Sequence, residues 1–133
     1  MTRRPGRRGP DERGSALVDF ALVTLVLLPA VLGIVQVALV LHVRTTLAAA
    51  ASEGARLAAT SGAGPADGVA RTREQVAEGI GARYATDVAV RRVTLAGAPA
   101  VEITVHAAVP ALGLGGPAIE LTVTGRAVEE DPP

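Results

Sequence analysis

The chain has 133 residues, room for one small domain, and its 13 basic and 13 acidic residues give a formal net charge of zero. It has no cysteine, which excludes disulfides, zinc thiolates and a thiol nucleophile. With one Phe, one Tyr and no Trp, its core must consist of aliphatic side chains, and the exclusive use of Arg as the basic residue suggests a GC-rich bacterial genome.

The zero net charge hides an uneven distribution along the chain. Residues 1–14 hold five arginines against two acids, whereas residues 42–133 hold eight arginines against ten acids. Between them, residues 20–41 form a run without a formal charge. About 20 apolar residues span a bilayer core as a helix, and flanking arginines mark the cytoplasmic side. We therefore expect a single-pass protein of the bacterial cell membrane, with a cytoplasmic N-terminus and an extracytoplasmic C-terminal domain.

Two other interpretations of the apolar run fit less well. A secretory signal would be cleaved near "LAAAAS", residues 47–52, but signal cores of 7–15 residues are shorter than this run, and Arg44 precedes that site. The twin arginines of the leader lack the apolar sequence that should follow them in an export signal. A buried helix of a soluble protein would need a larger domain to surround it.

Asp19 lies at the start of the run. A carboxylate costs about 2.5–3.5 kcal/mol at the centre of a membrane helix, and less near its end, where the side chain reaches the interface. One interpretation is an interfacial aspartate. In the other, cleavage after Gly14 makes Ser15 the first residue. The new α-amine would then lie about one helical turn from Asp19 on the same face, or beside it on a neighbouring subunit.

The stretch "RGSALVDFALV", followed by the long apolar run, resembles the processing site of type IV pilin-like proteins. More narrowly, it is similar to the TadE-like pseudopilins of tight-adherence (Flp) pilus systems. The matching residues are Gly14, Ser15, Asp19, Phe20 and Ala21, and the resemblance is strongest over residues 13–60. Two features depart from the pattern: the family acid is usually Glu, and many pilins carry Phe where this chain has Ser15.

The resemblance implies that a membrane prepilin peptidase cleaves the Gly14–Ser15 bond on the cytoplasmic side. The product would be a minor pilin-like subunit that contacts the membrane, other pilin-like subunits and the pilus assembly platform. The alternative is an unprocessed single-pass membrane protein with a small extracytoplasmic interaction domain. Either way, we expect a leader at 1–14, a membrane helix and its extension at 15–60, and an α+β domain at 61–133.

Inside the predicted membrane helix, Pro29 removes a backbone donor and predicts a kink, and Gly33 leaves a small surface beside it. Thr24 and Gln36 are polar residues of the same run. Beyond Leu41 the helical pattern continues as a thin face of mostly small residues, suited to close packing on a helix or sheet. Its members are Leu47, Ala50, Ala51, Gly54, Leu57 and Ala58.

The rest of the chain predicts a small α+β domain. A second short helix is expected at about residues 67–84, after the helix-breaking stretch "SGAGPADG". Alternating apolar residues predict strands near 88–95, 101–109 and 119–128, joined as a three-stranded antiparallel meander with one buried face. The pair Arg91–Arg92 interrupts the alternation of the first strand and suggests a bulge.

No motif predicts catalysis, a cofactor, a metal, a nucleic acid or a small-molecule substrate. We expect His42 at the membrane interface and His106 on the exposed sheet face. Glu102 and Glu120 are expected to be solvated strand residues that could neighbour each other. In the loop "PALGLGGP", residues 110–117, Leu112 and Leu114 are candidates for partner contact or for closing the core, and "EEDPP" predicts a frayed acidic tail.

Overall fold

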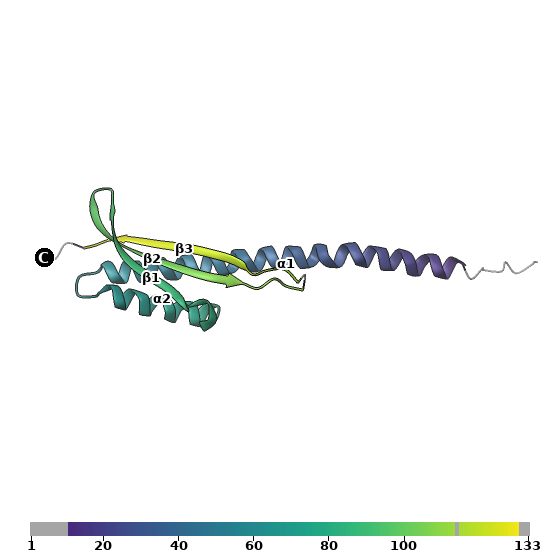
Figure 1. Cartoon of the computed structure of the whole chain (residues 1–133), viewed down its shortest axis with the longest axis horizontal. Helices are drawn as coiled ribbons and strands as arrows, with labels where there is room; N and C mark the ends of the chain where they lie inside the picture. The colour runs from purple at the N-terminus through teal and green to yellow at the C-terminus, as the bar shows by residue number, and fades with distance from the viewer. Residues whose placement is uncertain (1–10, 114, 131–133) are drawn as a thin grey trace, which may run out of the picture. The chain divides into compact units, whose positions relative to one another are not determined.

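The structure, a computed structural model, describes residues 11–113 and 115–130. Residues 1–10 of the expected leader, Leu114 of the candidate partner loop and residues 131–133 of the expected tail lie outside the described residues. The elements are α1 (Asp11–Ala59), α2 (Pro65–Gly79), the 3₁₀ turn η1 (Ala82–Tyr84), β1 (Asp87–Leu95), β2 (Ala98–Val109) and β3 (Ile119–Val128) (Figure 1). The predicted α+β class, with a long first helix, a short second helix and three antiparallel strands, is confirmed.

Contacts group the described residues into two compact units, one ending at Val35 and one beginning at Gln36. The first unit is the N-terminal part of α1, whose side chains are mostly exposed and apolar. The helix continues through Pro29 and Gly33 without interruption, so the chain does not unwind there. The kink at Pro29 stays a prediction.

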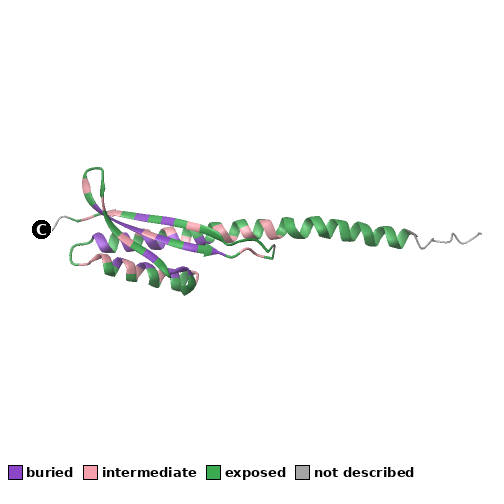
Figure 2. Cartoon of the chain, in the orientation of Figure 1, coloured by how far each residue is buried: buried purple, intermediate pink, exposed green. Residues whose placement is uncertain are grey.

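In the second unit, helices cover one face of the sheet (Figure 1). The buried residues, coloured purple in Figure 2, lie where α1 and α2 meet the strands. The fully buried ones include Val43 and Leu47 of α1, Val76 of α2, and Ile103 and Val105 of β2. The core is therefore mostly aliphatic, as the composition predicts, and includes the aromatic side chain of Tyr84.

The small residues of α1 let its neighbours approach closely. A Cβ added at Gly54 would collide with Thr72 Oγ1 and would lie 2.6 Å from the backbone oxygen of Gly68 in α2. A Cβ at Gly125 of β3 would collide with the backbone of Ala51. The predicted small-residue face thus packs on both a helix and the sheet, although Leu57, expected on that face, is 36% exposed.

The sheet has the order β1-β2-β3, and both neighbouring pairs are antiparallel. Strands β1 and β2 are joined by a two-residue turn at Ala96 and Gly97, whose φ angles of 51° and 86° match the twist of a tight hairpin. The predicted bulge is wrong, because the register runs unbroken through Arg91 and Arg92. Arg92 lies at the exposed end of the helix-facing side and pairs with Glu129 at 3.0 Å, so no phase shift is needed.

The second helix ends earlier than predicted, at Gly79 rather than at residue 84. Gly81 adopts a φ of 107°, a conformation that L side chains rarely take, and this reverses the chain before η1. The turn then buries Tyr84 against the core.

The described part of the acidic tail is held rather than frayed. The Glu130 N–H donates to the backbone oxygen of Ala59 at the end of α1 (2.9 Å), and the Glu129 N–H donates to that of Pro99 (2.9 Å). These bonds satisfy backbone groups at the end of the helix, and they extend the sheet past β3.

Candidate functional site

The predicted processing residues lie near the start of α1, and all of them are exposed. A Cβ added at Gly14 would meet no atom within 4 Å, so nothing in the described chain requires a glycine there. Glycine inside a helix is unfavourable by roughly 0.5–1 kcal/mol relative to alanine. Ser15 and Asp19 are four residues apart in the helix and therefore share one face. The arrangement leaves this segment open to an external enzyme or subunit.

The helix that carries these residues is long and apolar enough to cross a membrane, by length and composition. Its exposed side chains include Leu17, Phe20, Leu25, Leu28 and Ile34. Water would be a costly environment for so much contiguous apolar surface, because about 25 cal/mol is lost per Å² left exposed. This surface fits a single-pass membrane protein.

A shallow apolar groove runs along one side of this helix, with a volume of about 580 Å³. Thr24 is its polar member, and Pro29 lies at one end. Since Pro29 has no N–H, the carbonyl of Leu25 lacks its usual helical donor. In a membrane such a group must find another partner, and neighbouring helices are one source of donors. The other lining residues are Leu17, Phe20, Ala21, Leu25 and Leu28.

Gln36 connects α1 to the loop between β2 and β3. Its Nε2 donates to the backbone oxygen of Pro110 at 3.2 Å, and its Oε1 accepts from the Leu112 N–H at 2.7 Å. Leu112 is half-buried, and this exposure fits both of its predicted roles, partner contact and closing the core. The sequence identified Gln36 only as a polar residue of the run. A side-chain amide is costly in apolar surroundings unless it is hydrogen-bonded, so its position in an apolar helix could have indicated that Gln36 has hydrogen-bond partners.

Glu102 is the charged residue that sequence reasoning placed wrongly. It is 2% exposed rather than solvated, because Arg91 of β1 and Arg126 of β3 lie over it from both sides. Arg126 Nε donates to Oε2 at 2.5 Å, and Arg91 Nε donates to Oε1. Glu120 is not a neighbour, since it pairs in register with Ala108.

These hydrogen bonds, first from Arg126 and then from Arg91, hold the pKa of Glu102 below its ordinary value, against the opposing effect of burial. Glu102 is therefore ionised throughout the neutral range and ties the three strands together. Each carboxylate oxygen thus accepts one hydrogen bond from an arginine of a neighbouring strand.

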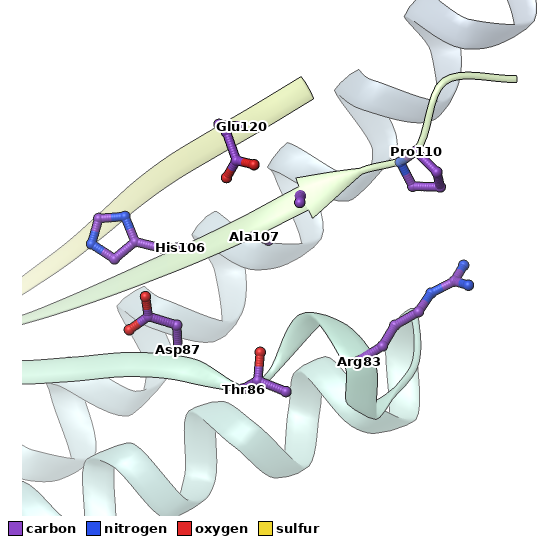
Figure 3. Close-up of a pocket in the computed structure, with 8 residues that line it drawn as sticks. Arg83, Thr86, Asp87, His106, Ala107, Pro110 and Glu120 are labelled. Atoms are coloured by element: carbon purple, nitrogen blue, oxygen red, sulfur yellow. The ribbon is translucent and has the colours of Figure 1, made fainter. Parts of the chain in front are cut away.

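The strands leave a shallow pocket of about 330 Å³ at the end of the sheet (Figure 3). His106 lies there opposite Asp87 in register, and its Nδ1 is 3.0 Å from Thr122 Oγ1. His106 is exposed, as predicted. Arg83 points away from His106 and Asp87 in Figure 3, and its guanidinium lies 4.8 Å from the centre of the Tyr84 ring. Within residues 11–113 and 115–130, no group of three or more His, Cys, Asp or Glu side chains is arranged to hold a metal ion.

No curated protein and no solved structure matches the chain. One protein-family model does, described as "TadE-like protein", over residues 14–56. The matched segment begins at Gly14 and ends at Arg56, so it lies wholly within α1. The match confirms the resemblance that Gly14, Asp19 and Phe20 indicated: over residues 14–56 the chain is similar to the TadE-like family.

Proposed function

We propose that this protein is a minor pilin-like subunit that takes part in assembly of a tight-adherence (Flp) type IV pilus, and that prepilin peptidase cleaves it after Gly14. The proposal is supported above all by the family match, which begins at Gly14 and covers the exposed apolar helix, with Asp19 five residues after Gly14. In this proposal the protein has a structural role and catalyses no reaction.

The leader stays in the cytoplasm and α1 crosses the membrane, so the domain that begins at Gln36 faces outward. The arginines of residues 1–14 support this orientation. The peptidase then reaches an exposed Gly14–Ser15 bond at the cytoplasmic side.

Cleavage supplies Asp19 with a counter-charge. The Ser15 α-amine of the same or of a neighbouring subunit pairs with the Asp19 carboxylate when subunits join. Their attraction is stronger where water is scarce, because the local dielectric constant is lower than in bulk water. The exposed face of α1 and the groove beside Pro29 provide the apolar surface on which another pilin-like helix packs.

The test is the mature N-terminus of the protein co-expressed with its prepilin peptidase. Wild type should begin at Ser15, whereas Gly14→Leu should retain the leader. Gly33→Leu is the matched control, because Gly33 is also a helical glycine with no atom within 4 Å of an added Cβ. That variant should be shortened normally. Normal shortening of Gly14→Leu would refute cleavage at this bond.

The same measurement separates the alternatives. An unprocessed single-pass protein would begin at Met1 or Thr2, and a secreted one near Ser52. The structure gives a reason against secretion: a cut at residues 47–52 would detach Val43, Leu47 and Ala50, which are buried in the core of the second unit.

A further inference from the structure

The loop between β2 and β3 has a fixed position along α1. Its first residues are bound to Gln36 through the two hydrogen bonds to Pro110 and Leu112. The sequence from Ala107 to Ile119 contains no charged residue. The described residues from Gly115 to Ile119 are exposed, and Ile119 is a large apolar side chain with 39% exposure. An uncharged loop is therefore held beside a helix that continues into the proposed membrane span.

The position of Gln36 sets a limit on the membrane. Irregular backbone exposed to lipid does not occur within the hydrocarbon layer, since its N–H and C=O groups would lack partners. The loop at Gln36 must therefore lie outside that layer. The layer is about 30 Å thick, which corresponds to about 20 helical residues at 1.5 Å each. The 20 residues that precede Gln36 are residues 16–35, all uncharged except Asp19. The span thus ends near Val35, not at Leu41.

The residues that would lie in the headgroup layer are 37–41, which follow Gln36 and are all apolar. This layer is about 5–7 Å thick on each side of the bilayer, or about three to five helical residues. Val37 and Leu41 are exposed and apolar, and His42 and Arg44 follow directly. The first charged residue of α1 beyond the span, Arg44, is about 12 Å along the helix from Gln36 and therefore lies beyond the headgroup layer, in water.

We propose that the flanks of this loop, residues 110–113 and 115–119, rest in the outer headgroup layer and give the protein a second contact with lipid. Leu112 and Ile119 would reach toward the acyl boundary, and Gln36 holds the loop at this depth. The inference rests on α1 crossing the membrane, as in the proposed function. A bilayer is favoured over a protein partner because the loop is tied to the helix at the end of the span.

The experiment uses the full chain in liposomes, with single cysteines labelled by an environment-sensitive fluorophore. The chain has no cysteine of its own, so each label has one position. Leu112→Cys and Ile119→Cys report on the loop. Thr124→Cys is the aqueous control, because it is exposed on the same strand as Ile119, and Leu27→Cys is the control within the span.

Labels at 112 and 119 should show blue-shifted emission, loss of quenching by iodide, and quenching by lipids that carry a quencher near the headgroup. The label at 124 should show no blue shift, should be quenched by iodide, and should not be quenched by the lipids. Lipid quenching at 27 but not at 112 and 119 would overturn the inference and leave the membrane anchor intact. Absence of lipid quenching at 27 would refute the anchor itself. Shielding of the loop labels only when pilus subunits are added would also overturn the inference, in favour of a protein partner.

A second variant tests the role of Gln36. Gln36→Leu keeps α1 apolar but removes both hydrogen bonds, so the label at 112 should lose lipid quenching and become accessible to iodide. Thr24→Leu, which removes a polar side chain elsewhere in the run, is the matched control and should leave the label unchanged. Unchanged lipid quenching at 112 in Gln36→Leu would refute the positioning role of Gln36.

Discussion

The close approach between α1 and α2 can be tested at Gly54. Gly54→Ala places a Cβ against Thr72 Oγ1 and 2.6 Å from the Gly68 backbone oxygen. Neither atom can move easily. Thr72 is fully buried, and its hydroxyl donates to the backbone oxygens of Gly68 (2.9 Å) and Ala50 (3.3 Å).

Three effects determine the size of the change. Overpacking costs about 1–3 kcal/mol, and disturbing the Thr72 hydrogen bonds costs about 0.5–1.5 kcal/mol. Alanine recovers about 1 kcal/mol through its helix propensity. The net expectation is a loss of about 0.5–3.5 kcal/mol in the free energy of unfolding. For a domain of this size, each kcal/mol lowers the Tm by about 4–8 °C.

The assay is thermal unfolding of the full chain in detergent, followed by circular dichroism. Gly33→Ala is the matched control, because nothing lies within 4 Å of its added Cβ, and it should leave the Tm unchanged or slightly raised. Combining Gly54→Ala with Thr72→Ala should restore part of the lost free energy of unfolding, since Thr72→Ala removes the hydroxyl that clashes with the added Cβ. A Gly54→Ala variant at least as stable as wild type would refute the close-packing argument.

Two further predictions concern the carboxylates. Asp19→Asn should insert and be cleaved normally but fail to crosslink to other pilus subunits, because it keeps the shape of Asp19 and loses its charge. Asp19→Glu keeps the charge and should retain much of the pilus assembly. Normal assembly by Asp19→Asn would exclude charge pairing as the role of Asp19. Glu102→Gln should lower the free energy of unfolding at pH 7 by about 1–3 kcal/mol. Because the folded pKa of Glu102 is lowered, its contribution is complete above the unfolded pKa near 4.5 and disappears as the pH falls through the folded value. Urea unfolding of both proteins at pH 7 and in acid should therefore show a difference that shrinks in acid, and a constant difference would contradict the ion-pair account.

The sequence determines the local features of this protein. The long helix follows from an uncharged run in which nearly every residue is apolar, and the strands follow from alternation of period two. The predicted processing motif is also local, since Gly14, Ser15 and Asp19 lie within six consecutive residues, and the family match begins at Gly14. Such features need no knowledge of the contacts made by distant segments.

Only the tertiary structure decides which distant residues meet. Alternation places Glu102 on the polar face of β2, but the register of β1 and β3 sets Arg91 and Arg126 beside it and buries it. Gly54 and Gly68 are separated by the turn between α1 and α2, and their close contact depends on how the helices cross. Gln36 and Leu112 are 76 residues apart in sequence. Periodicity indicates which face of an element is buried, whereas the choice of partners depends on register and helix packing, which arise when the whole domain folds.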